Sequence, residues 1–225
     1  VLNDHDTVVR RIERAPIELD SLLSTKPDSP VAYYGLTHIP LAFYLGYQLS
    51  DSKYQIQLFE LNNTSGRWDQ LNGLSTPVSL IADKSTLARN DNSGDVIMSI
   101  GISYPVHQSE IDELGLSNIL GQVSLNAETP QRQLITNDTQ IDQVCAEFKS
   151  MLEHIKNTCP NREKIHLFYS GPVSLCFALG RCMSERIDSE IISYNYSVKE
   201  TPKYNWALSL NGPTTKSANI NKIAA

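Results

Sequence analysis

An internal repeat constrains the fold of this chain more than any other feature of its sequence. Residues 41–50 (LAFYLGYQLS) match residues 175–184 (LCFALGRCMS) at an offset of 134 positions. In both copies Leu, Leu and Leu or Met recur at every fourth position, which places them on one face of a helix. Both copies also carry a Gly inside that helix, although such a Gly costs about 1 kcal/mol relative to Ala. The repeated Gly therefore predicts a close approach, which we expect between the helix and a sheet.

The two tryptophans of the chain extend this repeat. Trp68 precedes residues 71–73 (LNG), and Trp206 precedes residues 210–212, which have the same sequence. Two matches in the same order predict two degenerate copies of one strand–helix–strand unit. We therefore expect the two Trp side chains at equivalent places in two pseudo-symmetric halves.

Apolar patterns along the chain predict strands that alternate with helices. This order indicates the α/β class, with two Rossmann-like halves and largely parallel sheets. We expect a lead-in helix or linker over 1–27, a first half over 28–128 and a second half over 129–225. Expected helices cover 7–24 (with a break at Pro16), 39–49, 109–114, 138–157 and 173–186. Expected strands cover 31–36, 54–61, 78–82, 96–102, 120–125, 164–169, 190–198 and 204–210, with a turn over 62–67.

Composition excludes several classes of protein. The chain has 225 residues with 40% hydrophobic and 20% charged side chains, which is ordinary for a globular protein. It has no apolar run near the roughly 20 residues of a spanning helix and no signal peptide, so we expect a cytoplasmic protein. Because Val1 is not a Met, we expect that an N-terminal partner domain is missing. A membrane tether in that missing part would change the location.

Charge and cysteines narrow the possible partners. The net charge is −6, which makes duplex nucleic acid an unexpected partner. Residues 107–153 hold eight acidic and two basic side chains, whereas residues 199–225 hold four Lys and one Glu. This basic segment could meet a small anion, or it could be an ordinary solvated surface.

The four Cys form no CxxC pair, so we expect reduced core thiols, no metal site and no cofactor.

Two equivalent loops are the candidate ligand site. Residues 35–40 (GLTHIP) and 170–172 (SGP) each combine Gly, a hydroxyl and Pro directly before the repeated helix. In open α/β sheets a ligand lies beyond the carboxyl ends of the strands, beside helix N-termini whose free N–H groups attract an anion. Thr37 or Ser170 could instead simply cap its helix. Aromatic residues near the strand ends could stack on a base, although most of them are expected in the core.

Catalytic motifs are missing from the sequence. It contains no G-x-S-x-G, H-E-x-x-H or Walker A pattern, and His38 has no nucleophile or acid partner in the sequence. We therefore expect a binding protein and not an enzyme.

These segments resemble a known family. Residues 164–184 (KIHLFYSGPVSLCFALGRCMS), with 204–212 (YNWALSLNG), resemble the core motif of SAVED domains. Residues 31–46, with Arg67 and Trp68, resemble the first half of that family, and the resemblance covers about residues 16–215. SAVED domains are similar to two fused CARF-like subunits, and they sense cyclic oligonucleotides in CBASS anti-phage defence.

The resemblance implies a function. It implies a cyclic tri- or tetra-adenylate-like ligand between the halves and a fused N-terminal effector of nuclease, TIR, protease or transmembrane type. It also implies activation through ligand-induced self-association, as a homo-oligomer or filament. The alternatives are a ring nuclease that degrades the same ligand, or a module that binds nucleosides or sugars. The candidate ligand-binding residues are Thr37, His38, Arg67, Trp68, Tyr169, Ser170, Gly171, Pro172, Lys199, Lys203, Tyr204 and Trp206.

Overall fold

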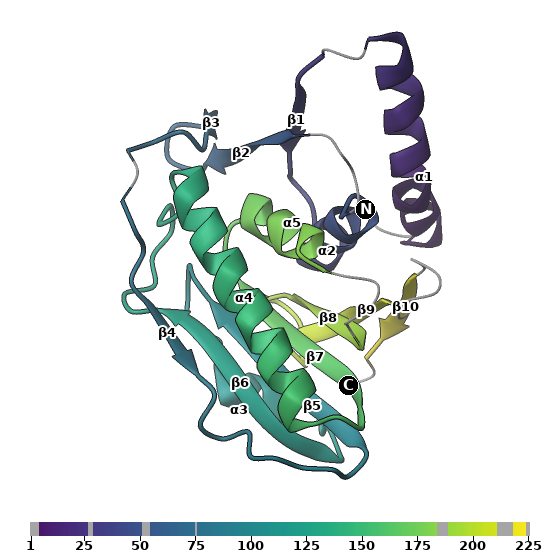
Figure 1. Cartoon of the computed structure of the whole chain (residues 1–225), viewed down its shortest axis with the longest axis vertical. Coiled ribbons are helices and arrows are strands. Elements are labelled where there is room, and N and C mark those ends of the chain that lie inside the picture. The colour runs from purple at the N-terminus through teal and green to yellow at the C-terminus, as the bar shows by residue number, and fades with distance from the viewer. Residues whose placement is uncertain are drawn as a thin grey trace.

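Two sheets enclose a pair of helices in this protein. The computed structural model describes residues 5–26, 29–50, 55–74, 76–183, 189–210 and 218–223. Helices α2 (Ile39–Gln48) and α5 (Val173–Arg181) lie between a three-stranded and a seven-stranded sheet (Figure 1). Both helices are apolar nearly all round and almost fully buried, as expected for elements covered on several sides.

The small sheet has the order β1-β2-β3. Its first two strands are parallel, and β3 returns beside β2 as a hairpin. The hairpin turn forms because the Asn62 side-chain oxygen accepts from the backbone N–H groups of Thr64 and Ser65, and Gly66 has a positive φ of 68°. The predicted turn over 62–67 is thus confirmed, although the sequence patterns missed β3. The strands are β1 (Val31–Tyr34), β2 (Ile56–Asn62) and β3 (Arg67–Gln70).

The large sheet has the order β10-β9-β8-β7-β5-β6-β4. The pairs β5/β6, β5/β7 and β7/β8 are parallel, whereas β4/β6, β8/β9 and β9/β10 are antiparallel. Across the described strands of both sheets, four pairs are parallel and four antiparallel, so the predicted largely parallel sheets are not confirmed. The strands are β4 (Leu80–Asp83), β5 (Gly94–Gly101), β6 (Ile119–Ala127), β7 (Arg162–Ser170), β8 (Glu190–Tyr196), β9 (Tyr204–Leu210) and β10 (Ala218–Lys222).

Helices cover both faces of the large sheet. The long helix α4 (Asp138–Thr158) lies across it on the side of α2 and α5 (Figure 1). Its first turn is fixed by Asn137, whose side chain accepts from the N–H of Gln140 at 3.0 Å. The prediction over 138–157 is confirmed. The short helix α3 (Gln108–Asp112) packs on the opposite face, where Ile111 joins a separate apolar cluster.

Helix α1 (His5–Thr25) lies outside the sheets against α2 (Figure 1). The predicted break at Pro16 is wrong, because the helix continues through this residue. Pro inside a helix loses one backbone hydrogen bond. Here Val9 and Leu23, both buried, anchor the helix on either side of Pro16. A second boundary also differs: the helix expected over 173–186 ends at Arg181, and residues 184–188 lie outside the described residues.

The repeated glycines mark a contact between the two helices. A Cβ on Gly46 would overlap the carbonyl oxygen of Phe177, and a Cβ on Gly180 would overlap that of Phe43. The expected close approach is therefore real, but its partner is a helix and not a sheet. The reason is that α2 and α5 share the narrow space between the two sheets.

The elements around these helices follow one order twice. The series β1-α2-β2-β3 and β7-α5-β8-β9 each have a parallel pair followed by an antiparallel strand. The two Trp residues lie on the corresponding third strands but on opposite faces. Trp206 packs with the main core, whereas Trp68 contacts the half-exposed ring of Tyr34. The expectation of equivalent places is therefore wrong for the side chains.

Strands β4, β5 and β6 lie between the two series in sequence, and they belong to the same sheet as the strands of the second series. β5 lies between β6 and β7, so strands on both sides of the predicted boundary at residues 128 and 129 share the seven-stranded sheet. The small sheet contains only strands from residues 31–70.

Candidate functional site

The carboxyl ends of β5 and β7 form a topological switch point in the large sheet. From β5 the chain continues to α3 on one face, and from β7 it continues to α5 on the other face. Adjacent parallel strands whose connections diverge in this way leave a crevice at their carboxyl ends. The carbonyl of Ser170 accepts from the N–H groups of Ile102 and Ser103 at 2.7 and 3.0 Å, which ties the two strand ends together.

Tyr169 supports the loop that leads into α5. Its hydroxyl donates to the carbonyl oxygen of Pro172 at 2.8 Å, and burial raises the pKa of this hydroxyl, so it remains a donor. A Cβ on Gly171 would overlap the Tyr169 hydroxyl, so only Gly fits beneath the ring. In the first copy Tyr33 covers Gly35 in the same way. The loop before α2 is two residues longer than the loop before α5.

The N-terminus of α5 already faces a negative charge from the protein itself. The Glu60 carboxylate, on β2, accepts from the backbone N–H of Ser174 at 3.0 Å. A carboxylate at a helix N-terminus is favourable because it meets a free N–H and the positive end of the helix dipole. A phosphate bound to this helix end would therefore have Glu60 as a neighbour.

The N-terminus of α2 makes the corresponding contact with the other series of elements. His38 is the N-cap residue, and its Nδ1 lies 2.9 Å from Oδ1 of Asn195 at the end of β8. Since this oxygen can only accept, Nδ1 carries the proton. The His38 ring also meets Trp206 edge-on at 5.6 Å. Each helix N-terminus thus contacts a strand of the opposite series.

Tyr104 and Arg132 lie beside the carboxyl end of β5, and the sequence patterns missed both residues. Tyr104 is the third residue after the end of β5, is 49% exposed, and has the Arg132 guanidinium over its ring at 5.4 Å from the centroid. The loop of Arg132 is held to the end of β5, because the N–H of Gln131 donates to Ile102 O at 3.3 Å. Inspection of the residues after each predicted strand would have found Tyr104. Nothing local in the sequence indicates its pairing with Arg132.

The structure places some of the predicted ligand-binding residues near the N-termini of α2 and α5 and others away from them. Tyr204 is buried on the α3 side of the sheet, where it meets Phe168 edge-on at 4.8 Å. Lys203 donates from Nζ to the carbonyl of Val198 at 2.6 Å, within its own loop, and Lys199 is exposed on that loop. The residues at or just before the helix N-termini are Thr37, His38, Ser170, Gly171 and Pro172. Tyr169 on β7 and Trp206 on β9 contact Pro172 and His38, whereas Arg67 and Trp68 lie on the hairpin strand of the small sheet.

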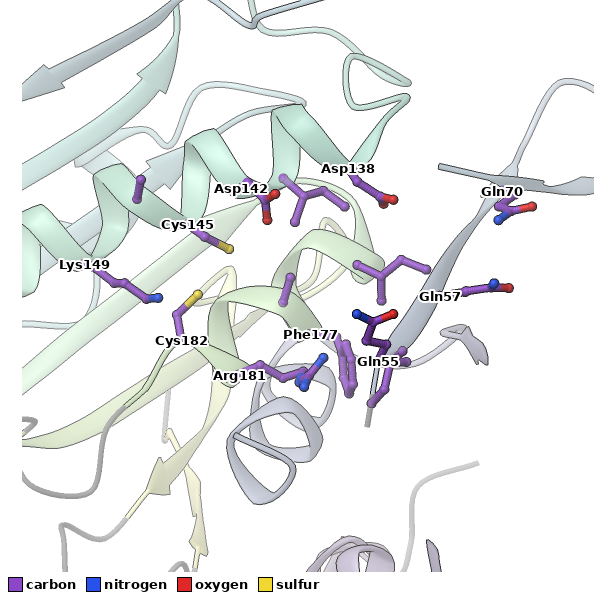
Figure 2. A pocket seen from close by; sticks show the side chains of 15 residues that line it. Gln55, Gln57, Gln70, Asp138, Asp142, Cys145, Lys149, Phe177, Arg181 and Cys182 are labelled. Carbon is purple, nitrogen blue, oxygen red and sulfur yellow. The ribbon is translucent and has the colours of Figure 1, made fainter. Parts of the chain in front are cut away.

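A second feature is a cleft of about 850 Å³ between β2, α4 and α5, which sequence analysis did not indicate. Figure 2 shows Lys149 and Arg181 near the Cys145 and Cys182 sulfurs, and Asp138 and Asp142 nearer the start of α4. The cleft lies along the last turns of α5, so it is separate from the crevice at the strand ends.

No helix in the described part of the chain is both long enough and apolar enough to cross a membrane.

Solved structures share this fold. The Acinetobacter baumannii Cap4 SAVED/CARF-domain receptor with the cyclic trinucleotide 2′3′3′-cAAA matches 92% of this chain and 44% of its own, at 13% identity and a TM-score of 0.62. The Moraxella osloensis Cap4 receptor matches 90% and 41%, at 16% identity and a TM-score of 0.59. The A. baumannii receptor with 3′3′3′-cAAA matches 72% and 35%, at 16% identity and a TM-score of 0.53. The chain thus spans less than half the length of these receptors.

The mixed α/β architecture is therefore similar to that of these SAVED/CARF-domain receptors. The family model for the SMODS-associated and fused to various effectors sensor domain matches residues 17–210, and the chain belongs to this SAVED family. None of the curated protein sequences compared with the chain matches it.

Proposed function

We propose that this chain senses a cyclic oligonucleotide of the cyclic tri- or tetra-adenylate kind and activates a fused effector in anti-phage defence. The observation that carries the proposal is the match of the SAVED sensor family over residues 17–210. Two structures of one receptor with the same fold, that of A. baumannii, hold cyclic trinucleotides (3′3′3′-cAAA and 2′3′3′-cAAA), which supports this ligand class. We assign the chain no catalytic role of its own.

We further propose that the ligand lies in the crevice at the helix N-termini. The exposed Tyr104 ring offers a face for a base, and stacking of one base on an aromatic ring contributes about 1–3 kcal/mol. Arg132, beside it, offers a cation for a phosphate. His38 and Asn195 offer polar groups from the opposite helix end.

Because the net charge of the chain is −6, attraction of an anionic ligand depends on the few groups that surround it. A cyclic trinucleotide carries three negative charges, so its attraction must come from a few cations and from backbone N–H groups. Glu60 at the α5 N-terminus works against an anion there, which favours the α2 end and Arg132 for phosphate contacts.

The two series β1-α2-β2-β3 and β7-α5-β8-β9 are the proposed cores of two CARF-like halves. We keep 28–128 and 129–225 as their extents, with β4, β5 and β6 completing the sheet of the second half. The ligand would hold the halves in one relative orientation, and this orientation would favour self-association and effector activation.

Substitution at the crevice tests the ligand site. Tyr104→Ala and Arg132→Gln should each weaken binding of 3′3′3′-cAAA about 5- to 150-fold in calorimetry, because each removes roughly 1–3 kcal/mol of stacking or charge-assisted contact. Arg89→Gln is the matched control, since the exposed Arg89 pairs with Asp91 and precedes β5, at the amino end of the strand whose carboxyl end leads to Tyr104. If both crevice variants bind like the wild type, the ligand site lies elsewhere.

A further inference from the structure

Cys145 on α4 and Cys182 at the end of α5 form a thiol pair at the cleft. Their sulfur atoms point toward one another, as Figure 2 shows, and they share a hydrogen bond. The described cysteines are all reduced in the structure. Two thiols that face one another from neighbouring helices are an arrangement from which a disulfide, with an S–S distance of about 2.05 Å, can form.

The two members of the pair have different environments. Cys145 is buried, whereas Cys182 is only partly buried and lines the cleft, so a small reagent can reach it from solvent. The hydrogen bond from Cys145 lowers the pKa of Cys182, and the cations of Lys149 and Arg181 lower it further. The same hydrogen bond, together with burial, raises the pKa of Cys145. Cys182 is thus the attacking thiolate and Cys145 the proton-bearing partner.

The other two cysteines lack these features. Cys159 and Cys176 are both completely buried, and burial raises the pKa of each thiol. They therefore serve as internal controls on the same chain.

We propose that Cys145 and Cys182 are an oxidisable dithiol, a modification site that peroxides convert into a disulfide between α4 and the end of α5. The Cys182 thiolate attacks one peroxide oxygen, the O–O bond breaks, and hydrogen peroxide leaves a sulfenic acid on Cys182 and a hydroxide ion. The Cys145 thiol then attacks the Cys182 sulfur, the S–O bond breaks, and water leaves with the thiol proton. In total, two thiols are oxidised and one peroxide is reduced to two waters.

This disulfide would restrain α5, a helix that contacts other elements at both of its ends. The last turn of α5 contains Gly180, which touches α2, and the first turn leads from the crevice at the strand ends. The disulfide would tie this helix to α4 and narrow the cleft between them. Cytosolic disulfides of this kind are mostly transient and redox-sensing.

The test follows all four thiols of the reduced chain during exposure to hydrogen peroxide. After alkylation of the unfolded protein, peptide mass analysis should show a Cys145–Cys182 crosslink and free Cys159 and Cys176. We expect Cys182 to react at least about tenfold faster than the two buried controls. Equal oxidation of all four thiols, or a crosslink between other cysteines, would overturn the proposal.

Two variants separate the roles within the pair. In Cys145→Ser, the sulfenic acid on Cys182 has no resolving thiol, so it should persist and react with dimedone. In Cys182→Ser, Cys145 should stay reduced at the same peroxide dose. Oxidation of Cys145 in that variant at the wild-type rate would contradict the assignment of Cys182 as the attacking thiolate. If a variant folds poorly, the crosslink map of the wild-type protein still tests the proposal.

Discussion

Gly46 and Gly180 occupy reciprocal positions in the contact between α2 and α5. A Cβ on Gly46 would lie 3.0 Å from the backbone nitrogen of Arg181, and a Cβ on Gly180 would lie 3.0 Å from that of Tyr47. Each would also overlap a carbonyl oxygen of the opposite helix. Two helices that approach backbone to backbone in this way leave no room for a side chain at either position.

The first prediction concerns these two glycines. Gly46→Ala and Gly180→Ala should each lower the free energy of unfolding by about 1–3 kcal/mol, because the helices must separate to admit the methyl group. Gly115→Ala is the matched control: no atom lies within 4 Å of its Cβ position, so its cost should come only from the positive φ of 58°. Urea unfolding measures all three. Equal stability of Gly46→Ala and wild type would mean that the helices are not in close contact.

The second prediction concerns the carboxylate at the start of α5. Glu60→Gln should lower the free energy of unfolding by about 0.5–1 kcal/mol, because the helix end loses its negative neighbour but keeps a hydrogen-bond acceptor. The effect should shrink as salt is added, since part of it is electrostatic. Glu153→Gln on the exposed side of α4 should have almost no effect. Identical urea midpoints for the two variants would contradict the role of Glu60.

The third prediction concerns pH and a buried histidine. His166 lies between the Tyr194 hydroxyl, 2.8 Å from Nδ1, and the Asp95 carboxylate, 3.0 Å from Nε2. Burial lowers the pKa of His166 below its ordinary value of 6.5, and Asp95 offsets only part of this effect. The unfolded chain therefore binds a proton more readily than the folded one as the pH falls through 6.5.

Stability contributed by neutral His166 is thus fully present above pH 6.5 and is lost as the pH falls toward the lowered pKa. His166→Gln should flatten the fall in unfolding free energy between about pH 7 and pH 5, although the variant is less stable throughout. Asp95→Asn should steepen it, because the neutral amide no longer favours the protonated imidazole. Parallel pH profiles for wild type and His166→Gln would show that this residue does not titrate in that range.

Much of the fold follows from local patterns in the sequence. Helix α4 was predictable because Val144, Phe148, Met151 and Ile155 recur at helical spacing and all four are fully buried. The strand directions were not predictable in the same way. Whether neighbouring strands are parallel depends on which strands become neighbours, and β1, β2 and β3 form a small sheet apart from all the strands that follow them in sequence. Local patterns also did not indicate that α1 could continue through Pro16.

The candidate site was predictable only in part. The loops before α2 and α5 were evident because Gly and Pro stand directly before the repeated helix. The contacts that shape them join distant parts of the chain: Glu60 reaches Ser174 across 114 positions, and His38 reaches Asn195 across 157. Patterns within a short window carry no information about such pairs.

The fourth prediction concerns self-association. Saturating 3′3′3′-cAAA should raise the mean molecular mass of the chain in analytical ultracentrifugation, because the ligand binds the associating form more tightly than the resting form. If the acidic residues 107–153 of one copy meet the basic residues 199–225 of another, added salt should weaken the association, since screening acts within about 8–10 Å. A monomer mass that stays constant at saturation would contradict this mechanism.

The central claim is that this chain recognises a cyclic oligonucleotide without consuming it. Isothermal titration of the folded chain with 3′3′3′-cAAA, 2′3′3′-cAAA and linear triadenylate, with mass analysis of the recovered ligand, tests this claim most directly. We predict saturable binding of at least one cyclic form, weaker binding of the linear form, and an unchanged ligand mass. Equal affinity for the linear form, or recovery of a ring-opened product, would contradict it.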